Sequence, residues 1–116
     1  MEAINKDSYG YVNIPYGEAT FTPETGIETY TASVIEFGKC VNINITIGQS
    51  ATAGSRMIGT ISGLHSALTR TYLVPVVGVT ANGSVVTFAQ ISTNGEVTVV
   101  VTDDFLGFSL AGTIIL

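Results

Sequence analysis

The sequence has very few charged residues and no tryptophan. Asp, Glu, Lys and Arg make up 11% of its 116 residues, whereas an ordinary soluble domain has about 25%. The net charge is −5, and the only cations are Lys6, Lys39, Arg56 and Arg70. Nucleic-acid binding requires several clustered cations that displace counterions from the phosphates. Four scattered cations do not supply such a cluster, so the sequence argues against DNA or RNA as a partner.

Long apolar runs and paired cysteines are also missing. No apolar stretch approaches the roughly 18 residues of a membrane span, and Met1-Glu2 does not begin a secretion signal. We therefore expect no membrane insertion. Cys40 is the only cysteine, which excludes an internal disulfide and a multi-cysteine metal site and fits synthesis in a reducing cytoplasm. Within a strand, we expect Cys40 to be a small apolar filler.

Residues that favour β-strands are present in excess. The chain has 16 Thr, 13 Val and 12 Ile, together about a third of its length. Between Leu73 and Val101, three β-branched runs are separated by two short breaks that each end in Asn-Gly. Asn-Gly tolerates the positive φ angles of tight hairpin turns. The pattern predicts a three-stranded antiparallel meander over residues 73–101.

The clearest single strand is predicted at Cys40–Ile47. Its apolar residues alternate with Asn and Thr, so that one face carries Val41, Ile43, Ile45 and Ile47. Burial of four such side chains contributes roughly 1.5 to 3 kcal/mol each before entropy costs. A slip by one residue would bury the polar face instead. We therefore expect this strand to anchor the core in a fixed register.

Shorter segments on both sides complete an all-β pattern. Strands are predicted at 9–14, 20–22, 28–37 and 57–61, with one or two more in 105–116. Residues 1–8 are interpreted as a loose N-terminal segment, 23–26 as a turn, 48–56 as a surface loop and 62–72 as an extended loop. The total of eight to ten short strands predicts a single domain, residues 1–116. Its expected fold is an antiparallel, jelly-roll-like β-sandwich.

Residues that could carry chemistry are sparse. His65 is the only histidine, and no Gly-x-Ser-x-Gly nucleophile motif accompanies it. We therefore expect a loop histidine that hydrogen-bonds to its neighbours, no catalytic residues and no cofactor. Asp103 and Asp104 are the only adjacent acidic pair, but the spaced ligands of a calcium loop are missing. We interpret them as turn residues and expect no metal site.

Tyrosines are the remaining candidates for ligand contact. Their aromatic faces can stack on sugar rings, and their hydroxyls can hydrogen-bond to sugar hydroxyls. The chain has Tyr9, Tyr11, Tyr16, Tyr30 and Tyr72. For any one of them, a structural place at a strand end or an interface is the more frequent role.

Five stretches of the chain follow one another in a distinctive order: 38–47 with an alternating strand, 57–61 with an Ile-Gly-Thr segment, 74–76, 94–99 with an Asn-Gly turn, and 108–114. Taken in this order, they resemble the C-terminal receptor-binding domains of bacteriophage tail fibres and baseplates and related prophage tail proteins. The resemblance covers roughly residues 29–116. Where the family often has a Pro-x-Gly-x-Arg-Pro-like loop, this chain has Ser62–Leu68. The resemblance implies a small β-sandwich that forms a homotrimer and binds a saccharide on the host surface.

The leading hypothesis is therefore a non-enzymatic, receptor-binding domain of a phage or prophage tail fibre or baseplate. It would adhere to a host cell-surface glycan as a homotrimer, contact other tail or baseplate proteins, and reside in the virion after synthesis in the bacterial cytoplasm. The low charge agrees with burial of one face between copies. Its candidate ligand-binding residues are His65, Arg70, Tyr72, Asp103 and Asp104.

Two other functions remain open at this stage. The chain could be a purely structural virion or tail component that binds no glycan. It could also be a small β-sandwich hydrolase or lyase, which would need a cleft containing a carboxylate of perturbed pKa or His65.

Overall fold

The computed structural model describes residues 16–116, and these residues form nine β-strands and no helix. The prediction of an all-β protein with eight to ten short strands is confirmed. The predicted strand at 9–14 and the N-terminal segment 1–8 lie outside the described residues. Since 16–116 contain no helix at all, none there is long and apolar enough to cross a membrane. The strands are β1 (Tyr16–Glu18), β2 (Thr20–Pro23), β3 (Thr29–Phe37), β4 (Cys40–Ile47), β5 (Gly54–Ser62), β6 (Tyr72–Thr80), β7 (Gly83–Ile91), β8 (Glu96–Val101) and β9 (Gly107–Ile115).

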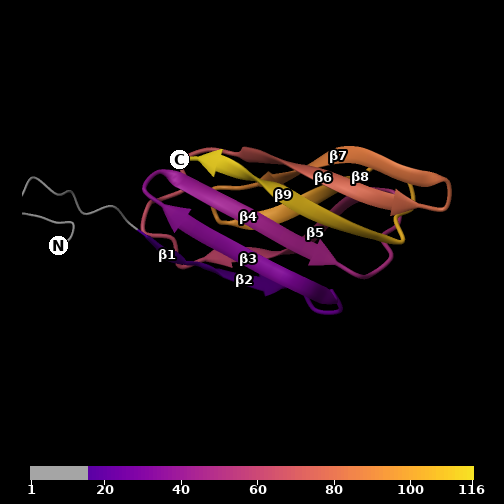
Figure 1. Cartoon of the computed structure of the whole chain (residues 1–116), viewed down its shortest axis with the longest axis horizontal. Coiled ribbons are helices and arrows are strands. Elements are labelled where there is room, and N and C mark those ends of the chain that lie inside the picture. Colours follow the sequence, from indigo (N-terminus) through magenta and orange to yellow (C-terminus); the bar gives the residue numbers. More distant parts are fainter. Residues whose placement is uncertain (1–15) are drawn as a thin grey trace, which may run out of the picture.

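All nine strands belong to one antiparallel sheet that is rolled up and nearly closed (Figure 1). The strand order is β1-β3-β4-β9-β6-β7-β8-β5-β2, so β1 and β2 lie at the two edges. These two strands are consecutive in the chain and are separated only by Ala19, whose N–H donates to the Val34 carbonyl at 2.8 Å. One short segment therefore pairs with β3 on one side and β5 on the other, and bridges the two edges. The expected jelly-roll-like sandwich of two sheets is not confirmed by this arrangement.

Strand β4 has the bounds and the orientation that its alternation predicts. It lies between β3 and β9, and its four inward residues are each at most 1% exposed. Cys40, in contrast, shares the outward face with Asn42 and Asn44 and is exposed, so the expectation of an apolar filler was wrong. The reason is parity, because Cys40 alternates with the buried Val41.

The predicted meander is also confirmed. Strand β6 pairs with β7, and β7 pairs with β8, both antiparallel. Thr80 pairs with Gly83, so the first turn consists of Ala81 and Asn82. In the second turn, Gly95 has φ 82°, and a side chain there would collide with the Ile61 carbonyl. Glycine is therefore required in that turn for both its conformation and its lack of a side chain.

The boundaries around β5 differ from those predicted. The strand starts at Gly54 and ends at Ser62, so it is longer than the expected 57–61 and takes over the end of the expected loop 48–56. Between Met57 and Gly59 its register with β8 shifts by one residue. Such a bulge interrupts the simple alternation of faces. Segment 105–116 contributes one strand, β9, and 63–71 form an extended loop as predicted.

Connections alternate between the two ends of the barrel, since neighbouring strands are antiparallel (Figure 1). We call them the Glu36 end and the Phe105 end, after the residue that holds the main loop at each. The Glu36 end contains the β3–β4 turn, the β5–β6 loop 63–71, the β7–β8 turn 92–95 and the C-terminus. The Phe105 end contains the connections 24–28, 48–53, 81–82 and 102–106.

Candidate functional site

The five candidate residues from the sequence lie at opposite ends of the barrel. His65 and Arg70 belong to the β5–β6 loop, and Tyr72 begins β6 at the same end. Asp103 and Asp104 belong to the β8–β9 loop at the Phe105 end. The structure therefore does not gather the five side chains into one site.

The two aspartates order their own loop. Asp103 Oδ1 accepts a hydrogen bond from the backbone N–H of Asp104 at 2.8 Å. Asp104 Oδ1 accepts one from the N–H of Ala53 at 3.0 Å and so ties the β8–β9 loop to the β4–β5 loop. Both residues are exposed. These bonds agree with their interpretation as turn residues.

Arg70 and Tyr72 fix the end of the β5–β6 loop. Arg70 Nη2 donates to the Ile115 carbonyl at 3.1 Å, and the guanidinium carbon lies 5.2 Å from the centre of the Tyr72 ring. Such a cation–π contact contributes roughly 0.5 to 1 kcal/mol at an exposed site. The Tyr72 hydroxyl lies 3.5 Å from the Thr69 hydroxyl. This contact lowers the pKa of Tyr72, while burial acts in the opposite direction.

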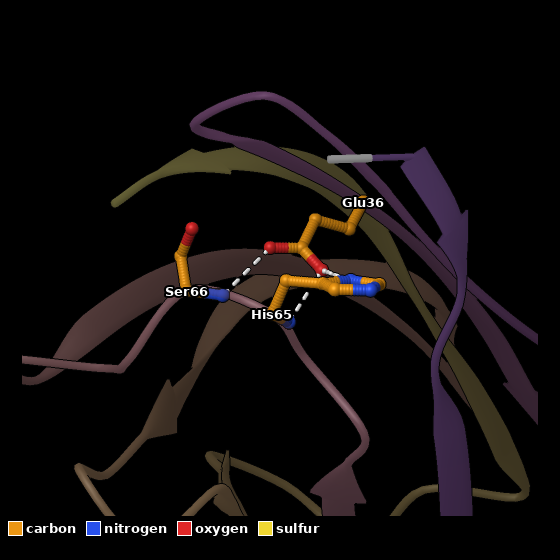
Figure 2. Close-up of polar contacts among 3 residues, drawn as sticks. All are labelled: Glu36, His65 and Ser66. Carbon is orange, nitrogen blue, oxygen red and sulfur yellow. Dashed lines mark hydrogen bonds and ion pairs between the residues drawn. The ribbon is translucent and has the colours of Figure 1, made fainter. Parts of the chain in front are cut away.

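His65 is bound to Glu36, a residue far away in the sequence (Figure 2). Glu36 Oε1 accepts the backbone N–H of His65 at 2.7 Å and lies 3.1 Å from His65 Nδ1. Glu36 Oε2 accepts the backbone N–H of Ser66 at 3.0 Å. The Glu36 side chain is 1% exposed, and that of His65 is 63% exposed. His65 is thus a loop residue with a hydrogen-bonded neighbour, and that neighbour, Glu36, comes from strand β3.

Glu36 is a buried carboxylate that the loop keeps charged. Burial raises the pKa of Glu36. The N–H groups of His65 and Ser66 and the His65 ring lower it by more than burial raises it, so the pKa is below the usual 4.5. Backbone N–H donors stabilise the charged form because they replace the water that burial removes. The carboxylate in turn fixes the backbone of the loop at residues 65 and 66.

Glu36 was not identified as important from the sequence. It falls in the predicted strand 28–37, whose two faces were both mixed. The available signal was parity, because Glu36 follows Val34 by two residues and both point inward. A carboxylate on an inward face requires buried hydrogen-bond donors, and the sequence does not say which loop provides them.

An open groove of about 280 Å³ lies between this loop and the β7–β8 turn. We call it the Ser66–Asn94 groove. Its wall includes hydroxyl, amide and aliphatic side chains and no charged residue. The side chains that could contact a ligand in the groove are Ser62, Leu64, Ser66, Leu68, Thr93 and Asn94. Leu64 and Leu68 also pack against the core, so the apolar part of the wall is supported from beneath.

A second groove, of about 390 Å³, lies on the outside of β9 toward the Phe105 end. We call it the β9 groove. Gly107 and Ser109 line it from β9, and larger side chains flank them. The flanking residues are Tyr30, Val77, Val79 and Leu106. The groove is therefore mainly apolar.

The described residues offer little for metal binding or nucleophilic catalysis. Within 16–116, no group of three His, Cys, Asp or Glu side chains could hold a metal ion. A Ser-His-carboxylate or Cys-His-carboxylate mechanism needs a hydroxyl or thiol hydrogen-bonded to the histidine. In the same part of the chain, the His65 ring bonds to the Glu36 carboxylate, and no such nucleophile is bonded to it.

Comparison with known proteins identifies no relative of this chain. No protein-family model, curated protein or solved structure matches the chain. The function must therefore be argued from the grooves, the anchored loop and the surface of the barrel.

Proposed function

We propose that this chain is a non-enzymatic, saccharide-binding domain of a phage or prophage tail fibre or baseplate. In this proposal it adheres to a host cell-surface glycan as a homotrimer within the virion. The observation that carries the saccharide part is the Ser66–Asn94 groove. The phage setting and the trimer are supported by the resemblance of the sequence stretches.

The groove has the chemistry that a neutral sugar requires. A sugar ring presents hydroxyls at its edge and C–H groups on its faces. Ser66, Thr93 and Asn94 can each donate and accept hydrogen bonds. Leu64 and Leu68 offer apolar contact to the C–H face. The wall carries no charge, so we expect a neutral saccharide and not an acidic one.

The Glu36 anchor supports this function, because it fixes one wall of the groove before a ligand arrives. The N–H of Ser66 is held by Glu36 at 3.0 Å. A wall that is already ordered loses less conformational entropy on binding. The groove is open, so each site is expected to be weak, and several copies in one assembly would raise the avidity.

Among the alternatives, a purely structural tail component is favoured by one observation. An uncharged, apolar outer face covers part of the barrel, as in proteins that contact other proteins. A hydrolase is not favoured, because within residues 16–116 no hydroxyl or thiol is hydrogen-bonded to the His65 ring, whose polar contact is with the Glu36 carboxylate. A purely structural component predicts that the folded protein retains no saccharide on an array.

The test is a glycan array followed by titration of any saccharide that binds. We expect the double variant Ser66→Ala/Asn94→Ala to lose at least tenfold in affinity and to unfold at nearly the wild-type temperature. The matched control is Ser55→Ala/Asn82→Ala, two exposed positions outside the groove. A wild-type protein that binds no glycan contradicts the proposal, and so does a groove variant that binds as well as the control.

The five residues chosen from the sequence remain testable in the same assay. His65, Arg70 and Tyr72 lie at the groove end of the barrel but are not part of the groove wall. Asp103 and Asp104 lie at the other end. Reduced binding by His65→Ala or Arg70→Ala would extend the site toward the C-terminus, and reduced binding by Asp104→Ala would place a ligand at the Phe105 end.

A further inference from the structure

Four neighbouring strands form a wall without charge. Strands β4, β9, β6 and β7 are adjacent in the sheet, and none of them contains Asp, Glu, Lys, Arg or His. The remaining strands, by contrast, include charged residues on β1, β5 and β8, namely Glu18, Arg56 and Glu96. The charged residues of the described chain thus lie in the loops and on one side of the barrel.

The outer face of this wall is apolar on β6 and β7. Strand β6 is apolar on both faces, and its outward residues Leu73, Pro75, Val77 and Val79 are exposed. An antiparallel strand with one face in water normally alternates apolar and polar residues. Across the pair, Val77 lies opposite Val86 and Pro75 opposite Phe88. These six residues form one patch, which we call the β6–β7 apolar face.

The face has an exposed apolar part and a hollow part. Val86, 75% exposed, and Phe88, 39% exposed, are outward residues two positions apart on β7, and we call this pair the Val86–Phe88 ridge. On the other side of β6, the small residues Gly107 and Ser109 of β9 lie beneath the β9 groove. Val77 and Val79 belong to both features, because they line the groove and border the ridge.

We propose that the occupant of this face is a second copy of the chain, with the Val86–Phe88 ridge of one copy seated in the β9 groove of the next. This inference rests on the proposed function for its homo-oligomer and names the surface that builds it. The exposed Leu106, 59% exposed, and Tyr30, 67% exposed, would then be covered at the rim of the contact.

The absence of charge on this wall favours a second copy over a charged partner protein. Each chain has a net charge of −5, so two copies repel unless they meet where neither carries charge. In the proposed contact the ridge of one copy meets the β9 groove of the next, and neither of these two surfaces carries a charged residue. A basic or acidic partner protein would find no complementary charge on this wall.

The size of the wall sets an upper limit for the contact. Four strands spaced about 4.8 Å apart, each of about nine residues at 3.3 Å per residue, cover roughly 600 Å² per copy. Two copies would contribute at most about 1,200 Å², which is the lower limit of specific, stable interfaces. The ridge and the groove cover only part of the wall, so the contact between any two copies is expected to be a small one whose fit comes from the ridge and the groove.

The test is the mass of the full chain in solution, measured by light scattering over a concentration series. We expect the wild type at three times 12.1 kDa, because a contact in which each ridge sits in the groove of the next copy closes only as a ring. Val86→Asp on the ridge and Leu106→Asp in the groove should each give a folded monomer, at least tenfold weaker in self-association. The matched control is Thr22→Asp, which places the same charge at an exposed, β-branched strand position on β2.

Mixing the two variants tests the ridge-in-groove arrangement. A Val86→Asp chain has an intact groove and a Leu106→Asp chain an intact ridge, so the mixture should form a 1:1 complex that neither forms alone. A monomeric wild type, a Val86→Asp variant that stays assembled, or a mixture that stays monomeric would overturn the proposal. Loss of saccharide binding with intact assembly would instead contradict only the proposed function.

Discussion

Each end of the barrel has a loop that is held by a buried side chain, and the two side chains have opposite chemistry. The loops are 63–71 at the Glu36 end and 102–106 at the Phe105 end. At the Glu36 end, a carboxylate from β3 accepts two backbone N–H groups of loop 63–71. At the Phe105 end, the loop 102–106 inserts its own aromatic ring, which is 1% exposed. Polar and apolar anchors can therefore serve the same structural purpose, but only the polar one responds to pH.

The apolar anchor is completed by a glycine and by backbone bonds. The Phe105 ring lies against Gly78, where a side chain would collide with it. Its centre is 5.9 Å from that of Phe108. The backbone of Phe105 exchanges two hydrogen bonds with Ala51, at 2.9 and 2.8 Å. The Phe105 contacts, which are packing and an isolated β-bridge, involve no titratable group, and the bond from the Ala53 N–H to Asp104 adds to them in the same loop.

The largest expected effect is at the apolar anchor. Phe105→Ala should lower the free energy of unfolding by about 3 to 5 kcal/mol, because it removes a fully buried ring and leaves a cavity. Urea unfolding at a fixed protein concentration measures this. Phe37→Ala is the control, since the Phe37 ring is 55% exposed and makes one edge contact with Tyr16. Equal losses in the two variants would mean that Phe105 does not anchor the loop.

The polar anchor should come next. Glu36→Gln keeps the size of the side chain but replaces one acceptor oxygen with an NH₂ group, which cannot accept the N–H of His65 or Ser66. We expect a loss of about 1.5 to 3 kcal/mol, the contribution of hydrogen bonds to a charged group. Hydrogen exchange at the amides of residues 65 and 66 should accelerate at the same time. Unchanged exchange there would show that Glu36 is not what holds the loop.

The pH dependence separates the two ends. The pKa of Glu36 is below 4.5 in the folded chain, so the unfolded chain binds a proton more readily. The stabilisation by Glu36 is therefore fully present above pH 4.5 and is lost as the pH falls through the lowered pKa. We expect Glu36→Gln to flatten the acid limb of a stability-against-pH curve, and Phe105→Ala to shift the whole curve down without changing that limb. A Glu36→Gln curve parallel to the wild type would contradict this assignment.

The smallest effects should come from the exposed partners at each end. His65→Ala removes a ring that is 63% exposed but retains the backbone N–H bonded to Glu36. Asp104→Ala removes one acceptor from the Ala53 N–H. We expect less than about 1 kcal/mol for either. Hydrogen exchange should quicken at Ala53 in Asp104→Ala and change little at residue 66 in His65→Ala. A large loss in His65→Ala would move the anchor from the carboxylate to the ring.

The candidate sites include contacts that the sequence did not predict. Arg70 and Tyr72 were chosen from one loop and do contact each other, because they are only two residues apart. Glu36 was overlooked, since its partners are the N–H groups of residues 65 and 66. Backbone donors leave no signature in a sequence. The groove between loop 63–71 and turn 92–95 was missed for a similar reason, because serine, threonine and asparagine in loops are indistinguishable from ordinary turn residues.

By itself, the sequence determined the local structure: the all-β class, the bounds and inward face of β4, the meander, and the extended loop before Tyr72. These follow from alternation along single strands and from the φ angles that particular turns need. Only the tertiary structure decided that β1 and β2 bridge the edges of one sheet, that Glu36 meets residues 65 and 66, and that four uncharged strands are neighbours. The physical reason is that alternation specifies which side chains point inward. The order of strands, by contrast, depends on burial and pairing summed over the whole chain.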